Sequence, residues 1–352
     1  MKISLIIVTY SLIFLSSFSI LLFLYLTIRR IVIRYQNKRF QERYGRIEND
    51  ILQILTYPEK NLAKQIAEKH KSRSKALTKV LVDYIEQIEG QAKEQLKEVF
   101  NLALKDKCLK DIHSKKQVRR LKATHLFVIF SDPSEAEHIV KLLNDTPIVK
   151  LVAINALSRI PTSDTLDHIF QSFANDALTN ARAYINILFG LGEKIKSHVQ
   201  KYLAKPLPIE KLSLLIELVG AIPLRSLYDD ILVFTEHPDK EIRIKVARAL
   251  GKMRIPASID ILTRLTGDNA WEVSAQALKS LGKLGDIAAV NVLTKALFSP
   301  FWHVRFNAGH ALANLGSQGI QELDKIKKQK GDRYAADMAT MVLEEVVFVG
   351  EG

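Results

Sequence analysis

A motif returns every 31 residues in the second half of the chain. Segments that begin at Ile242, Val273 and Val304 read IRIKVARALGKM, VSAQALKSLGKL and VRFNAGHALANL. Weaker copies in the same frame, 30 to 32 residues apart, begin at Lys211, Ala181, Val149 and Val118. A fixed period of about 20 to 50 residues is typical of repeat architectures, in which each unit stacks only on its neighbours. The period therefore predicts an array of similar units.

Two positions of the repeat, numbered as slots from the first residue of each copy, predict how each unit packs against the next. The ninth residue is always large and apolar: Leu126, Leu157, Phe189, Val219, Leu250, Leu281 and Leu312. The tenth residue is small in six of the seven copies: Ser158, Gly190, Gly220, Gly251, Gly282 and Ala313. Glycine in a helix costs about 1 kcal/mol relative to alanine, so we expect it where a neighbouring helix passes close or the helix ends. Apolar residues three and four apart between copies predict a second helix in each unit.

The frame resembles the short bacterial form of the HEAT-repeat family, whose second helix reads V-R-x-x-A-A-x-A-L-G. The resemblance covers roughly residues 115–325 and is strongest in the last three copies. It implies an all-α fold, an α-solenoid of HEAT-like helix pairs that serves as a scaffold for other proteins. It also implies that the motif cations pair with an aspartate in the preceding turn. The cations are Arg119, Lys150, Arg182, Arg243 and Arg305, and the available aspartates are Asp145, Asp176, Asp239 and Asp268.

The N-terminal segment is apolar and free of charge. From Ile3 to Ile28 there is no charged residue, and at about 1.5 Å per helical residue this stretch spans roughly 39 Å, which is enough to cross a bilayer. A cleavable signal peptide would have a shorter apolar run and a small-residue cleavage site. We therefore expect residues 1–28 to be an uncleaved transmembrane anchor at the start of the solenoid protein.

Positive charge follows the anchor directly. Residues 29–122 hold 24 Lys and Arg against 12 Asp and Glu, whereas residues 123–352 hold 26 of each. The positive-inside rule then predicts a single-pass protein of the inner or plasma membrane, with its N-terminus outside and its C-terminal domain in the cytoplasm. Charge beside an anchor favours anionic lipid headgroups over nucleic acid as the partner. The candidate membrane-surface residues are Arg29, Arg30, Arg34, Lys38 and Arg39.

The remaining pattern divides the chain further. We expect a basic juxtamembrane helix over 29–57, a break at Pro58, and a helical part over 58–114 with an interruption at Gly90. For residues 60–122, a solvated Lys-rich face is an equal alternative to a lipid-facing one. The repeats occupy 115–330, and a helix within 331–352 is expected to cap the hydrophobic end of the array.

One helical face, formed by positions 4, 7 and 11 of each copy, is the candidate partner-binding surface. In the late copies it is polar, and the candidate residues are Lys245, Arg248, Lys252, Lys279, Lys283 and His310. In the early copies it is mostly apolar, and such a patch is covered either by the preceding helices or by a partner. The early residues are Leu121, Val128, Val152, Tyr184, Ile187, Leu191 and Leu214. Trp271 and Trp302 occupy equivalent slots, where they cap a repeat junction or offer an aromatic edge.

Signs of catalysis are weak. The sequence has no phosphate loop, hydrolase elbow or zincin motif, and no His-Glu dipeptide of the kind that holds iron in the related deoxyhypusine hydroxylases. Cys108 is the single cysteine, and a structural cysteine is a better interpretation than a reactive thiol. We therefore expect no enzyme and no cofactor or metal.

The sequence thus predicts a membrane-tethered cytoplasmic scaffold or adaptor that binds proteins, among them a membrane enzyme complex. The alternative is a lyase or metal-dependent hydroxylase with its active site in the solenoid groove. A third function, nucleic-acid binding by the basic helices, predicts an affinity that falls steeply with salt.

Overall fold

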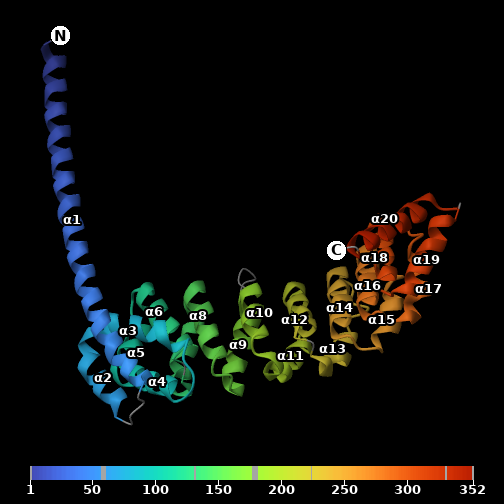
Figure 1. Cartoon of the computed structure of the whole chain (residues 1–352), viewed down its shortest axis with the longest axis horizontal. Helices are drawn as coiled ribbons and strands as arrows, with labels where there is room; N and C mark the ends of the chain where they lie inside the picture. Colours follow the sequence, from blue (N-terminus) through green and yellow to red (C-terminus); the bar gives the residue numbers. More distant parts are fainter. Residues whose placement is uncertain are drawn as a thin grey trace. The chain divides into compact units, whose positions relative to one another are not determined.

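The computed structural model describes residues 2–56, 61–130, 132–176, 181–222, 224–329 and 331–350. In these ranges the regular secondary structure is entirely helical, with no strand. The chain forms two compact units, Met1–Ser131 and Asp132–Gly352, and Figure 1 shows their helices. The prediction of an all-α solenoid that follows an N-terminal apolar helix is confirmed. The copy expected at Val118 lies in the first unit, and the other six lie in the second.

The first unit begins with one continuous helix, α1 (Lys2–Thr56), that contains both the apolar and the basic segments. Its side chains are exposed from Phe14 to Arg39. From Phe14 onward, the buried residues of the helix lie in its last turns, where Ile47, Ile51 and Ile54 pack against the helices that follow. The expected break at Pro58 lies outside the described residues.

Five further α-helices follow in the described part of the first unit. They are α2 (Leu62–His70), a short 3₁₀ turn at Lys71–Arg73, α3 (Ser74–Ile85), α4 (Gly90–Ala103), α5 (Lys105–Ile112) and α6 (Gln117–Ile129). Of these, α2, α3 and α4 pack against α1. The interruption predicted at Gly90 is confirmed, because this glycine has a φ of +71° where α4 begins. A second break at Leu104, which the sequence pattern missed, separates α4 from α5.

The second unit consists of stacked helix pairs. The first helices of the pairs are α7 (Ala136–Val140), α9 (Ser163–Asn175), α11 (Lys196–Leu203), α13 (Tyr228–Leu232), α15 (Ser258–Leu265), α17 (Val290–Ala296) and α19 (Ser317–Lys328). The second helices are α8 (Pro147–Ser158), α10 (Ala181–Phe189), α12 (Ile209–Ala221), α14 (Lys240–Met253), α16 (Trp271–Leu284) and α18 (Trp302–Ala313). Figure 1 shows the second helices side by side in one layer, and α12, α14, α16 and α18 pack successively against one another.

Glycines in the tenth slot allow these helices to approach closely. A Cβ built on Gly251 would lie 2.6 Å from Ser280 Cβ, and one on Gly220 would lie 2.6 Å from Ala249 Cα. The predicted role of the small residue is therefore confirmed in the late copies. Gly190 is different: it follows the end of α10, and its Cβ would meet only its own turn, at 3.4 Å from Ile187 O.

The copy expected at Val118 is one residue out of register. Phe127 is fully buried while Leu126 is half-buried, so Phe127 fills the ninth slot. Arg120, rather than Arg119, donates to the carbonyls five and six residues before it. Two motif arginines of later copies make the same pair of hydrogen bonds, Arg243 and Arg305.

The copy expected at Ala181 is out of register in the opposite direction. Leu188 is fully buried, whereas Phe189 is 52% exposed. Leu188 therefore fills the ninth slot, and the exposed Arg182 does not hold the position of the motif cation.

The ion pairs of the motif cations join successive copies. Arg243 Nε and Nη2 donate to the two carboxylate oxygens of Asp268 at 2.7 and 2.8 Å. Lys150 Nζ donates to Asp176 at 2.9 Å. In both cases the aspartate belongs to the following turn, so the expected pairing with the preceding turn is wrong. Asp239, in the preceding turn, instead accepts a hydrogen bond from the N–H of Glu241 and caps α14.

The last helix, α20 (Arg333–Gly350), covers the end of the array. It packs on α18 and α19, and its apolar side chains at Ala335, Met338, Ala339 and Val342 are buried. An open terminal repeat would leave its hydrophobic face in water, and α20 covers the apolar side of the last helices.

Candidate protein-binding surface

Cations on two adjacent second helices form a cluster in the second unit. We use the name cationic cluster for Arg248 and Lys252 on α14, Arg254 directly after α14, and Lys279 and Lys283 on α16. The side chains of Lys252, Arg254, Lys279 and Lys283 are exposed. None of these four makes an ion pair with any residue that the structure describes.

The charges of the cluster act on one another. The pKa of Lys283 lies below its ordinary value because of partial burial and then because of Lys279, Lys252, Arg248 and Arg254. A lowered lysine pKa means that the protein disfavours the charged form at this position. A negatively charged ligand would relieve that repulsion.

Arg254 was not among the predicted residues. It ends α14 with a φ of 52°, in the left-handed region, and in the described chain it is the one residue other than glycine with a positive φ. The next two copies have Gly285 and Gly316 at the same position of the frame, with φ values of 70° and 72°. A left-handed residue with a Cβ costs roughly 1 kcal/mol or more relative to glycine. The alignment of these positions was the sequence signal that could have singled out Arg254.

Lys245 and Arg248 both bond to neighbouring side chains, but of the two only Lys245 has a charged partner among the described residues. Lys245 forms an ion pair with Glu217 of α12. The pKa of Glu217 is lowered by the hydrogen bond from Lys245, against the effect of burial, and further by the charges of Arg248 and Lys252. Arg248 is half-buried, and its Nε donates to Gln276 Oε1 at 3.2 Å. Lys245 therefore lies at the edge of the cluster, already paired.

His310 lies apart from the cluster, beneath the capping helix. Its Nε2 is 3.4 Å from Glu345 Oε2 on α20, and its ring lies 4.3 Å from that of Phe306. The structure therefore brings together Arg248, Lys252, Lys279 and Lys283 but leaves His310 half-buried against the cap.

A shallow groove of about 360 Å³ adjoins the cluster and crosses α14, α16 and α18. Arg248, Lys279 and Gln276 line it together with Trp271 and His303. The rings of Trp271 and His303 are stacked, 5.0 Å apart with an angle of 13° between their planes. Trp271 thus packs at the repeat junction, and His303, which the sequence analysis did not single out, forms the facing wall.

Trp302 stacks on Phe306 with ring centroids 4.9 Å apart and remains 49% exposed. His303 also meets the edge of Trp302, so the two tryptophans are linked through this histidine. Trp271 is therefore the residue that packs between copies, whereas the ring contacts of Trp302 lie within α18 and leave it an exposed aromatic side chain.

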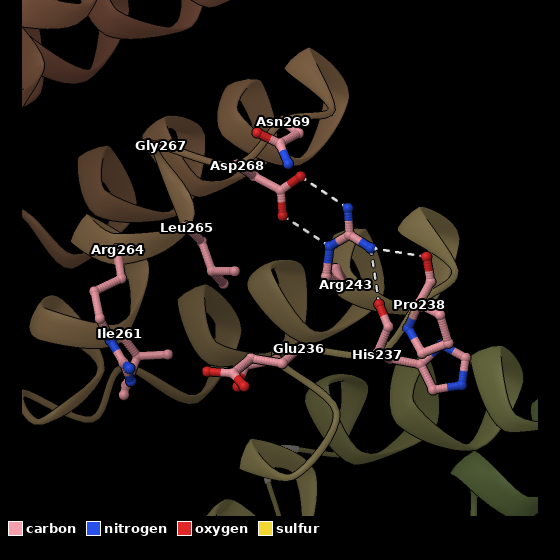
Figure 2. Close-up of a pocket in the computed structure, with 11 residues that line it drawn as sticks. Glu236, His237, Pro238, Arg243, Ile261, Arg264, Leu265, Gly267, Asp268 and Asn269 are labelled. Atoms are coloured by element: carbon pink, nitrogen blue, oxygen red, sulfur yellow. Dashed lines mark hydrogen bonds and ion pairs between the residues drawn. The ribbon is translucent and has the colours of Figure 1, made fainter.

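A second hollow, of about 510 Å³, surrounds the Arg243–Asp268 pair. Figure 2 shows the Arg243 guanidinium between the Asp268 carboxylate on one side and the carbonyls of His237 and Pro238 on the other. The hydrogen bond from Arg243 holds the pKa of Asp268 below its ordinary value. Because the charges of Arg243 and Asp268 satisfy each other, the pair is a structural joint between copies.

The described residues contain no group of three or more His, Cys, Asp or Glu side chains that could hold a metal ion. The thiol of Cys108 is buried, which raises its pKa to about 12. It is therefore protonated at neutral pH, as expected for a structural cysteine.

The membrane-surface candidates Arg29, Arg30, Arg34, Lys38 and Arg39 are all exposed on α1. Arg39 lies over the ring of Tyr35, 4.5 Å from its centroid. Within the described part of the chain, α1 is the one helix long and apolar enough to cross a membrane.

Family models match the late repeats. The HEAT-repeat model matches residues 264–344, and the model of the HEAT-like repeat of PBS lyases matches residues 242–268. Residues 242–344 are therefore HEAT-like repeats. A comparison with curated proteins gives no match.

Two solved structures of Kap121p show the same fold at low identity. Kap121p bound to Ste12p is 11% identical with a TM-score of 0.51, and the match covers 85% of this chain and 41% of Kap121p. Kap121p bound to Nup53p gives a TM-score of 0.50 with the same identity and coverage. The complex of CpcE and CpcF of phycocyanin lyase from Nostoc sp. PCC7120 is 16% identical, with a TM-score of 0.32, and covers 69% of this chain and 94% of that one. This chain spans less than half the length of Kap121p.

Proposed function

We propose that this protein is a membrane-tethered HEAT-repeat scaffold without catalysis, whose solenoid binds an acidic protein partner through the cationic cluster. The observation that carries the proposal is the position of Lys252, Lys279 and Lys283. They lie on neighbouring helices, exposed and without an ion pair to any described residue. Partial burial lowers the pKa of Lys283, and the charges of Lys279 and Lys252 lower it further. A repeat surface that maintains such repulsion gains most from a partner with opposite charge.

The tether is proposed from α1. Its apolar side chains from Phe14 to Ile28 are exposed, and Arg29 and Arg30 follow at once. Positive charge directly after the apolar segment supports a single pass through the inner or plasma membrane, with the N-terminus outside and the chain after the anchor in the cytoplasm. Tethering raises the effective concentration of the solenoid near other membrane proteins, and a membrane enzyme complex is the client that we expect.

The partner-binding proposal is tested by crosslinking and pull-down from detergent-solubilised membranes. The variant carries Lys252→Glu, Lys279→Glu and Lys283→Glu. A matched control reverses three exposed cations of the same unit that lie outside the cluster, Lys194, Lys196 and Lys327. We expect the first variant to lose the partner and the control to keep it. Equal recovery with both variants would contradict the proposal.

Topology is tested separately, with reporters at each end of the chain. A C-terminal reporter that is active only in the cytoplasm and an N-terminal tag that is accessible from outside would support the tether. Metal analysis of the purified full chain tests the non-catalytic part, because stoichiometric iron would favour a hydroxylase.

A further inference from the structure

A large cationic cavity lies in the first unit, where α1 leaves its apolar segment. It has a volume of about 960 Å³ and is formed by one face of α1 from Ile31 to Arg43, by the segment Ser72–Ala76 at the start of α3, and by Lys107 of α5. All of these residues belong to the same compact unit. The cavity is distinct from the cationic cluster of the solenoid.

All charged side chains that line the cavity are positive. Its lining includes five cations and no Asp or Glu: Arg39, Arg43, Arg73, Lys75 and Lys107. Of these, Arg43, Arg73 and Lys75 make no ion pair with any described residue. Lys107 Nζ donates to Ser74 Oγ at 2.6 Å, so its charge is not neutralised either.

Polar and backbone groups add to this charge. Ser72, Ser74 and Tyr35 line the cavity and can donate hydrogen bonds. Helix α3 begins at Ser74 without a side-chain cap, and the positive end of its dipole favours an anion at this end. Arginine forks and hydroxyls around one cavity are the groups that bind phosphate oxygens well.

The cavity also has an apolar wall that continues toward the anchor. Ile31 and Val32 line its end nearest the anchor, and Phe40 lies between Arg39 and Arg43. Ile31 follows the uncharged stretch by three residues, or roughly 5 Å along the helix. A soluble phosphate ester would meet the same cations but would gain nothing from this wall. A phospholipid has its phosphate next to glycerol and acyl carbons, in the order in which the lining changes from cationic to apolar.

We propose that this cavity binds the headgroup of one anionic phospholipid, with Arg43, Arg73 and Lys75 around the phosphate and Ile31 and Val32 beside the start of the acyl chains. The inference rests on the proposed tether, because it requires the cavity to lie at a bilayer surface. It goes further than the diffuse attraction of the exposed juxtamembrane arginines, because it assigns a single, saturable site.

The test uses the full chain in nanodiscs that contain equal amounts of phosphatidylglycerol and phosphatidylcholine. The lipid that remains bound on transfer to mild detergent is counted by native mass spectrometry. We expect one retained phosphatidylglycerol per chain. The variant Arg43→Gln, Arg73→Gln, Lys75→Gln is expected to lose roughly tenfold or more of this preference, since each cation near an anionic surface contributes about fivefold.

A matched control removes the same charge elsewhere in the unit, by Lys64→Gln, Lys110→Gln and Lys122→Gln, at exposed positions outside the cavity. It is expected to keep the bound lipid. An equal loss in both variants would show that general charge attraction, and not a specific site, holds the lipid. That result would overturn the proposal. Circular dichroism verifies that both variants are folded, and single substitutions replace the triple variant where it is not.

Two further experiments distinguish a failure of the lipid site from a failure of the proposed tether. Glycerol 3-phosphate, the soluble probe, is expected not to displace the lipid, and displacement at equal concentration would overturn the lipid assignment. Extraction with alkaline carbonate tests the tether. A wild-type chain that stays in the bilayer but shows no lipid preference overturns only the headgroup site, whereas a chain that is extracted overturns the proposed tether as well.

Discussion

Gly282 of α16 lies directly against Ala311 of α18, so closely that a Cβ on the glycine would come within 2.7 Å of both Ala311 Cα and Cβ. The contact leaves no room for a methyl group, because the obstacle is backbone rather than a flexible side chain. We therefore expect Gly282→Ala to destabilise the second unit by about 1–3 kcal/mol through overpacking, despite the better helix propensity of alanine. Urea unfolding followed by circular dichroism measures the change.

Gly267→Ala is the matched control for this prediction. A Cβ at Gly267 would meet only Arg264 O at an ordinary 3.5 Å. Its free energy of unfolding is expected to remain within about 0.5 kcal/mol of the wild type or to rise slightly. If both alanine variants unfold at the same urea concentration, close approach at Gly282 does not limit the packing of the late repeats.

The Arg243–Asp268 pair predicts a stability that depends on pH. The hydrogen bond from Arg243 lowers the pKa of Asp268 in the folded state. A lowered carboxyl pKa contributes stability above the ordinary pKa of about 4, and this contribution is lost as the pH falls through the folded value. Asp268→Asn removes the charged partner of a half-buried arginine and is expected to cost about 2–3 kcal/mol at pH 7.

The measurement compares urea midpoints of wild type and Asp268→Asn across the acid range. The difference is expected to be largest at neutral pH and to shrink as the pH falls from about 4, the ordinary pKa of the unfolded carboxyl, through the lowered pKa of folded Asp268. Asp239→Asn is the comparison variant, because Asp239 caps α14 through Glu241 N–H rather than pairing with Arg243. A constant difference at every pH would mean that the charge of Asp268 does not stabilise the joint.

The sequence predicted the repeat because hydrophobic burial constrains it. Residues such as Leu250 and Leu281 must be apolar to fill the space between helix pairs, and both are fully buried. The predicted register was wrong by one residue in the two copies where large apolar residues are adjacent, at Leu126 and Phe127 and at Leu188 and Phe189. A helix turns by about 100° per residue, so each pair spans the edge of the buried face, and spacing alone does not select the buried member.

Tertiary contacts decided the remaining differences. The partner of Arg243 is in the following turn because the helix pairs stack in that direction, and the motif does not contain this information. His310 was predicted to lie on the open surface, but it is half-buried because α20 packs beside it and places Glu345 next to its ring. The lining of the cavity in the first unit combines α1, α3 and α5, and no motif links residues so far apart in sequence.

Lys283 and Lys240 are expected to differ in their reactivity as amines. The pKa of Lys283 is lowered by burial and by neighbouring cations, whereas that of Lys240 is raised by its hydrogen bond to Glu272. Only the neutral amine is nucleophilic, so at about pH 9 Lys283 has the larger reactive fraction. Competitive acetylation with mass spectrometry is expected to show Lys283 half-labelled at a lower pH than Lys240.

The same labelling, repeated with the partner bound, also tests whether the partner covers the cationic cluster. An acidic surface over the cationic cluster would raise the pKa of Lys283 and protect it, while Lys240, already paired, would change little. Equal titration of the two lysines in the free protein would contradict the electrostatic repulsion inferred for the cluster.

Arg254 combines a backbone disadvantage with a place in the cationic cluster. It is left-handed where the next two copies have Gly285 and Gly316, so Arg254→Gly is expected to raise the stability of the second unit by about 1 kcal/mol. The same substitution removes a charge that acts on Lys283, and we expect it to weaken binding of the proposed partner several-fold. Improved stability with reduced binding is the pattern of a residue retained for function. Lys194→Gln, which removes an exposed charge outside the cluster, should change neither property, and unchanged binding by Arg254→Gly would show that Arg254 is not part of the binding surface.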